Sequence, residues 1–140
     1  MAFHSHGELN IWVDHNIVYM ELSGNWNLEK AKDFIHELNY TITPQVSPPF
    51  VAVAMLDNDW MPTADAIPYL FEATNRAINM GLVREAYVSS SPISSRVTKR
   101  FVVPEDSERY QSREFVDLDD AVQWLKEGLS GSAAVKQKCD

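Results

Sequence analysis

One stretch of the sequence, FVAVAMLD at residues 50–57, is apolar at successive positions and lacks the polar alternation of a half-buried strand. A strand of this kind is buried on both faces, which is typical of a parallel sheet covered by helices. The three prolines in residues 43–49 end any preceding helix, and the loop DNDWMP follows the stretch. We therefore expect residues 50–57 to form a central strand that brings Asp57 to an edge of a sheet.

Further strands and helices are indicated on both sides of this stretch. His15 and Asn16 suit a two-residue hairpin loop, because both residues tolerate positive φ, and Asn27 is a suitable N-cap. The order is β-β-α-β-α-β-α-β-α, an α/β fold with a single mixed sheet that opens with a hairpin and is covered by helices. The expected strands are 8–14, 17–23, 50–57, 82–88 and 110–116, and the expected helices are 28–40, 64–80, one that opens at Ser91, and 117–128.

Composition limits the class of protein. Hydrophobic residues make up 45% of the chain and charged residues 23%, as in a soluble globular protein. We expect one domain at 8–128, ended by Gly128, with flexible termini at 1–7 and 129–140. Cys139 is the only cysteine, which excludes an internal disulfide and a cysteine-based metal site. No apolar run approaches the ~20 residues of a membrane span and no signal peptide is evident, so we expect a cytoplasmic protein without membrane insertion.

The net charge of −8 is uneven along the chain. Residues 1–75 hold two basic side chains against ten acidic ones, whereas residues 76–140 hold ten of each. Such a surface repels phosphate backbones, which argues against nucleic acid and anionic membranes as general partners.

Three aspartates, Asp57, Asp59 and Asp65, follow the central strand at the edge where open α/β sheets bind ligands. A hard cation could bind there, but carboxylates before a helix are routinely caps and turn formers, which is the interpretation we favour. Acid and base catalysis would require one of them to be buried with a raised pKa. The histidines are not spaced as metal ligands and the serines lack a nucleophile elbow, so we expect neither catalysis nor a cofactor or metal.

A possible anion site lies at the start of the helix after residues 82–88. Ser91 would supply a hydroxyl at a helix N-terminus, and Arg96 and Lys99 would add positive charge on one side of that helix. The alternative interpretation is a solvated helix face.

The helix expected at 64–80 has a second apolar edge formed by Tyr69, Ala73 and Met80, with Trp60 in the loop before it. Thr63 suits the entry of this helix as a cap. Grouped exposed aromatic and methionine side chains favour a protein partner or a homodimer. The alternative is that another helix or the tail covers them. We assign partner contact to this edge together with Asp57, Asp59, Trp60 and Thr63.

The element order, the Asp-ended third strand and the closing phrase FVDLDDAVQWL resemble the STAS-like fold, and within it the SpoIIAA-like group. In that group the last strand is similarly followed by a D-x-x-x-A-x-x-W-L helix. The regulatory members carry a phosphorylatable serine at the start of the helix after the third strand. Here Asp65-Ala66 takes that place, and alanine has no hydroxyl.

The resemblance implies a non-catalytic regulatory or protein-interaction module, to which the residues Ser91, Arg96 and Lys99 add a candidate small-anion site at the carboxyl edge of the sheet. The alternative it implies is a carrier or sensor of a lipid-like apolar ligand. A carrier would need a cavity beneath the helices, lined by residues such as Phe34, Phe71 and Trp124.

Overall fold

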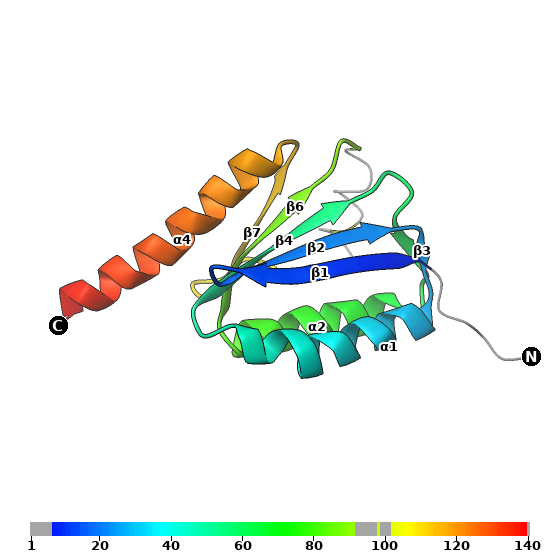
Figure 1. Ribbon diagram of the computed structural model, residues 1–140, viewed down its shortest axis with the longest axis horizontal. Helices are drawn as coiled ribbons and strands as arrows, with labels where there is room; N and C mark the ends of the chain where they lie inside the picture. Colours follow the sequence, from blue (N-terminus) through cyan, green and yellow to red (C-terminus); the bar gives the residue numbers. More distant parts are fainter. Residues whose placement is uncertain (1–6, 92–97, 99–101, 140) are drawn as a thin grey trace, which may run out of the picture.

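The computed structural model describes residues 7–91, 98 and 102–139, with side chains up to Ser130. Its main sheet has the order β1-β2-β4-β6-β7, with β1 antiparallel to β2 and the other neighbouring strands parallel (Figure 1). The middle strand is β4, and all of its residues except Met55 are buried, which confirms the expected central strand. The strands are β1 Glu8–Asp14, β2 Ile17–Ser23, β4 Phe50–Leu56, β6 Leu82–Val88 and β7 Gln111–Phe115.

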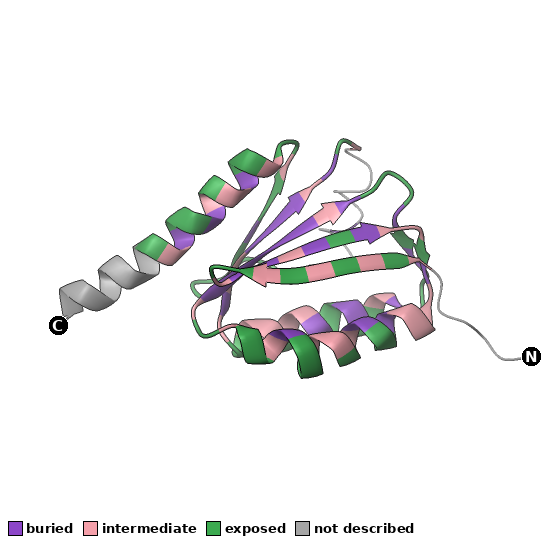
Figure 2. Ribbon diagram, in the orientation of Figure 1, coloured by how far each residue is buried: buried purple, intermediate pink, exposed green. Residues whose placement is uncertain are grey.

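Helices cover both faces of this sheet. α1 (Leu28–Glu37) and α2 (Ile67–Asn79) lie against one face, and α4 (Leu118–Cys139) lies against the other (Figure 1). Each face has its own core: Phe34 and Leu70 belong to the first, Ala121 and Leu125 to the second. Figure 2 shows the middle strands as mostly buried, whereas β1 alternates exposed and half-buried residues. The sheet therefore separates two apolar layers, as a run of apolar residues in β4 requires.

The hairpin and the first helix cap form as predicted. His15 and Asn16 have φ of 50° and 65° in a two-residue loop between β1 and β2. The Asn16 side chain also donates to the carbonyls of Ser47 and Pro49, which ties the hairpin to the chain entering β4. The Oδ1 atom of Asn27 accepts the Lys30 amide at 3.0 Å and caps α1.

α1 does not stop near Tyr40 in a simple turn. It continues as a π-helical turn, η1 (Leu38–Ile42), and a short 3₁₀ helix, η2 (Thr43–Gln45). Pro44 is tolerated because it lies at the first turn of η2, where its missing N–H is not needed. The helical path therefore reaches further over the sheet than the prolines led us to expect.

A second, two-stranded sheet was not predicted. β3 (Asn25–Trp26) and β5 (Met61–Pro62) pair in parallel, because the loops after β2 and β4 lie side by side. Trp26 and Trp60 meet edge to face beside this pair, with ring centroids 6.0 Å apart. Both indoles are buried, and they close the carboxyl end of the sheet.

Two further helix boundaries differ from the prediction by three residues or more. α2 begins at Ile67 instead of residue 64, and it ends before Gly81, whose φ is +118°. α4 passes through Gly128 and continues to Cys139, so Gly128 does not end it. A Cβ atom on Gly128 would lie 2.5 Å from Cδ of Arg84, so the glycine gives Arg84 room against α4. The helix expected at Ser91 lies mainly outside the described residues.

Candidate functional site

The predicted rim does form at the carboxyl end of the sheet. Ser90, after β6, donates to Oδ1 of Asn58, after β4, at 3.0 Å, so the two loops touch. Asp57 and Asp59 are exposed there and accept backbone N–H groups from Asn58 and Gly24. Asp57 therefore binds the backbone of its own loop, whereas Asp59 ties this loop to the one after β2. Among the described residues, no cluster of three or more His, Cys, Asp or Glu side chains is placed to hold a metal ion.

Thr63 lies at this rim but does not cap α2. Its hydroxyl donates to Oδ1 of Asp65, and its carbonyl accepts the Ala66 amide in a turn that precedes the helix. Thr63 and Asp65 are both exposed, because the helix begins one turn later than predicted.

Two of the side chains assigned to partner contact are buried, which corrects those assignments. Trp60 is 2% exposed because the β3–β5 pairing draws its loop against Trp26. Ala73 is 7% exposed because it faces the sheet together with Leu70. Tyr69 and Met80 are exposed, as predicted, and so is Phe71, which the sequence placed inward.

Of the three residues predicted to bind an anion, only Ser91 is among the described residues. Ser91 exchanges hydrogen bonds with Ser89: its amide donates to the Ser89 hydroxyl, which in turn donates to its carbonyl. Arg96 and Lys99 lie outside the described residues, so the anion site stays a prediction.

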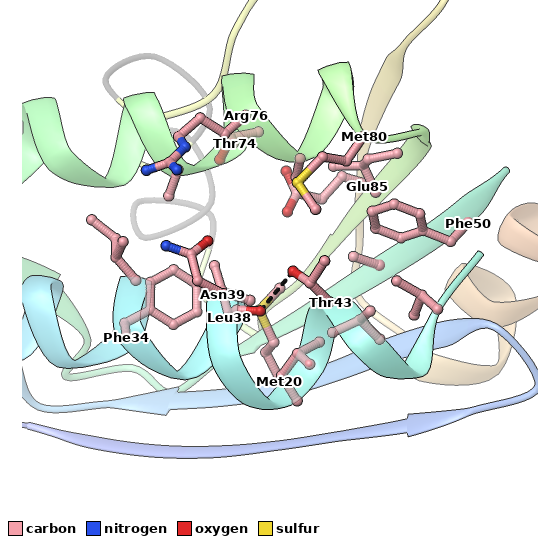
Figure 3. A pocket seen from close by; sticks show the side chains of 18 residues that line it. Met20, Phe34, Leu38, Asn39, Thr43, Phe50, Thr74, Arg76, Met80 and Glu85 are labelled. Atoms are coloured by element: carbon pink, nitrogen blue, oxygen red, sulfur yellow. Dashed lines mark hydrogen bonds between the residues drawn. The ribbon is translucent and has the colours of Figure 1, made fainter. Parts of the chain in front are cut away.

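The strongest candidate site lies elsewhere, in a pocket between α1, η1 and α2 over the sheet (Figure 3). Its open volume is about 70 Å³. Its wall is mostly apolar and comes from β2, β4, β6 and the three helical elements. The main apolar lining residues are Val18, Met20, Phe34, Leu38, Ile42, Phe50, Ala73, Ala77, Met80 and Leu82.

Few polar groups line this pocket. The hydroxyls of Thr43 and Thr74 donate to carbonyls of their own helical segments, at Leu38 and Leu70. Asn39 and Arg76 are exposed and therefore mark its mouth. Glu85 is 6% exposed, so its carboxyl group lies at the inner wall (Figure 3). The pocket thus combines a mostly apolar wall with one buried acid, the pattern of a small-molecule site.

Two tyrosines hold the Glu85 carboxyl group in place. The hydroxyls of Tyr87 and Tyr110 both donate to Oε1, the latter at 3.0 Å. Tyr87 is two residues along β6 on the same face, and Tyr110 immediately precedes β7. Both rings are buried. Oε1 therefore has two donors in a fixed arrangement.

The carboxyl group of Glu85 points into the pocket (Figure 3). Within the described part of the chain, Oε2 has no hydrogen-bond partner. The only fully enclosed polar side-chain atom without a partner there is Nε1 of Trp60, so Oε2 keeps accessible surface. A bound molecule could reach it.

Burial governs the protonation of this cluster. Desolvation raises the pKa of the Glu85 carboxyl group above its ordinary value, and the hydrogen bonds from Tyr87 and Tyr110 lower it only in part. Desolvation and the adjacent Glu85 also raise the pKa values of both tyrosine hydroxyls. The hydroxyls therefore stay protonated donors at neutral pH, while Glu85 is the group that titrates.

Sequence reasoning missed Glu85, although a signal was present. LVREAYV was predicted to be a strand next to the buried central strand, and a carboxylate there is expected to need a partner. Of the three residues proposed to line a carrier cavity, Phe34 does so. Phe71 is exposed, and Trp124 packs with Phe115 on the opposite face of the sheet, so neither lines the pocket.

Comparison with known proteins bears on the fold. An uncharacterised protein of the DUF3478 family from Shewanella loihica PV-4, described as having a SpoIIAA-like fold, matches this structure with a TM-score of 0.60. The match covers 89% of this chain and 98% of that protein, with 18% identical residues. This chain has a SpoIIAA-like fold. At that identity, the likeness extends to the fold alone.

The SpoIIAA-like fold agrees with the resemblance seen in the sequence. Neither a protein-family model nor a curated protein matches the chain. None of the described helices is both long and apolar enough to cross a membrane. Because a fold hosts many functions, the function has to be argued from the site.

Proposed function

We propose that this protein binds a small, largely apolar molecule in the pocket between α1 and α2. One observation carries the proposal: a mostly apolar pocket has a buried carboxyl group, Glu85, in its inner wall, and Oε2 keeps accessible surface. An apolar wall supplies affinity, and a single fixed polar group supplies orientation. This favours the apolar-ligand alternative over a binding site confined to the carboxyl rim.

The π-helical turn η1 supports this assignment. Leu38, Asn39 and Ile42 in this turn line the pocket, as does Thr43 immediately after it. π-helical turns are rare and occur frequently at functional sites, because they widen the helix and redirect its side chains. The irregular part of the helical layer therefore coincides with the pocket.

Filling the pocket should abolish binding. Ala77 lines the pocket, and Ala77→Leu would place added carbon atoms in an open volume of about 70 Å³. Titration with 1-hexanol, followed by ¹H–¹⁵N chemical shifts, should give saturable changes at Ala73, Ala77 and Leu82 in the unmodified protein. We expect these changes to be lost in Ala77→Leu.

Ala64→Leu is the matched control, because Ala64 is exposed and outside the pocket. It should bind 1-hexanol as the parent protein does. Equal binding by both variants, or shifts confined to exposed side chains, would contradict the proposal.

A second candidate function, partner contact through the outer surface of α2 and the rim, has its own support. Tyr69, Phe71 and Met61 are large apolar residues that are 42%, 39% and 41% exposed. Exposed groups of this kind favour a protein partner or a second copy of the chain. Asp57, Asp59 and Thr63 border this surface as exposed polar residues.

Light scattering tests this second candidate. If the surface joins two copies, the parent protein should have twice the mass of the 15.9 kDa chain, and Tyr69→Glu should return it to that of one chain, because a carboxylate is desolvated at the contact. Tyr40→Glu is the control, since Tyr40 is 72% exposed on a different element. A single-chain mass for the parent protein would exclude self-association through this surface.

A further inference from the structure

Among the residues that the structure describes, none places an opposite charge beside the buried acid of the pocket. Arg76 is the only cationic residue among the described residues that line the pocket, and it is exposed at the mouth without an ion pair to Glu85. Tyr87 and Tyr110 are neutral donors, and both bind Oε1. A buried carboxylate needs an opposite charge or a full set of hydrogen bonds. Within the described pocket, Oε2 of Glu85 therefore lacks a hydrogen-bond donor.

The shape of the pocket limits what can fill that position. Its open volume of about 70 Å³ is smaller than the roughly 150 Å³ of a dry apolar cavity that accepts benzene. A ligand of this size is held only in part, and a narrow aliphatic chain can fill the pocket while its remainder leaves through the mouth beside Asn39 and Arg76. Its wall of Val, Met, Leu, Ile, Phe and Ala side chains suits such a chain.

We propose that the ligand is a small aliphatic amine, whose ammonium group binds Oε2 of Glu85 while its alkyl chain lies between α1 and α2. This inference rests on the proposed function and names the chemistry of its ligand. The ammonium group supplies both the missing hydrogen-bond donor and the missing positive charge. The net charge of −8 favours the approach of a cation, and an anionic head group would meet the Glu85 carboxylate at the inner wall.

The surroundings of Glu85 determine how binding depends on pH. Among the described residues, the titratable groups in contact with Glu85 are Tyr87 on β6 and Tyr110 before β7. Arg76 on α2 lines the same pocket, and the η1 residue Asn39 and the adjacent Thr43 are uncharged. The hydroxyls stay protonated, and the solvated Arg76 acts weakly from the mouth. Binding of an ammonium group should therefore ionise Glu85 and release its proton when the free acid is protonated.

Three ligands with the same alkyl chain test the proposal: hexylamine, 1-hexanol and hexanoate. At pH 7.5, hexylamine should bind about tenfold more tightly than 1-hexanol, because its hydrogen bond is charge-assisted, and hexanoate should bind most weakly. Calorimetry in two buffers of different ionisation enthalpy should detect proton release on hexylamine binding, and the hexylamine affinity should rise with pH.

Glu85→Gln should bring the hexylamine and 1-hexanol affinities within about twofold of each other, because the charge is lost at nearly constant shape. Glu72→Gln makes the same charge change at an exposed α2 position outside the pocket, and it should keep the preference. Equal binding of hexylamine and 1-hexanol by the parent protein, or tightest binding of hexanoate, would overturn the amine assignment and leave the proposed function standing. Failure of all three to bind would overturn both.

Discussion

Trp26→Ala should lower the free energy of unfolding by about 3–5 kcal/mol, the usual cost of removing a buried Trp side chain. Trp26 is 0% exposed, and its indole Nε1 donates to the carbonyls of Glu8 and Ser23. Its ring also meets Phe34 and Trp60 at centroid distances of 5.4 and 6.0 Å. The substitution would therefore leave a cavity at the carboxyl end of the sheet and two carbonyls without their donor.

Urea unfolding of Trp26→Ala and Trp12→Ala gives the comparison. Trp12 is 42% exposed and stacks on Tyr19, so its removal should cost only about 1 kcal/mol. An equal loss of stability in the two variants would show that Trp26 does not organise the closed end of the sheet.

The second large effect concerns the pH dependence of stability. The ordinary pKa of a glutamate side chain is 4.5, and burial raises that of Glu85 in the folded protein. Between these two pKa values the folded state binds more protons than the unfolded state, so stability falls as pH rises through this window. Above the folded-state pKa, the buried charge has its full destabilising effect.

Glu85→Gln should remove this contribution, because the amide does not titrate. The unfolding free energy of Glu85→Gln relative to the parent protein should therefore increase between pH 4.5 and pH 8, by about 1.4 kcal/mol for each unit by which the folded-state pKa is raised. Urea unfolding across this range measures it. Glu72→Gln should follow the parent protein, and parallel curves for Glu85→Gln and the parent would contradict a buried, desolvated acid.

Residue patterns within short stretches of sequence predicted the parts of the fold that depend on few neighbouring residues. Continuous apolarity placed β4 at the centre of the sheet, and His15 and Asn16 formed the expected two-residue loop. Asn27 caps α1, and Oδ1 of Asp117 accepts the Asp119 amide at the start of α4. Each of these features is determined by residues that are close together in the sequence.

The face of α2 was predicted less well, because its inward side is lined partly by small residues. From the sequence, Ala73 was assigned to an exposed edge of this helix and Phe71 to the lining of a cavity beneath the helices. In the structure Ala66, Leu70, Ala73 and Ala77 follow one another at helical spacing and pack against the sheet layer, while Phe71 is exposed. Alanine contributes little to a hydrophobic periodicity, so the pattern does not show which face of α2 its alanines occupy.

The candidate site depends on distant partners, which is why sequence reasoning did not find Glu85. Tyr110 reaches Glu85 across 25 positions of sequence, and Arg84 donates to the carbonyl of Trp124 across 40. Arg84 and Glu85 are adjacent on β6, and their partners thus lie on opposite faces of the sheet. No local pattern in LVREAYV indicates those partners.

Direct titration of the Glu85 carboxyl group by ¹³C NMR, with and without hexylamine, tests the central claim that this buried acid is the polar anchor of the pocket. We expect a midpoint above 4.5 in the free protein and a lower midpoint when hexylamine is present, because the ammonium group stabilises the carboxylate. A midpoint at the ordinary value that hexylamine does not move would contradict this claim.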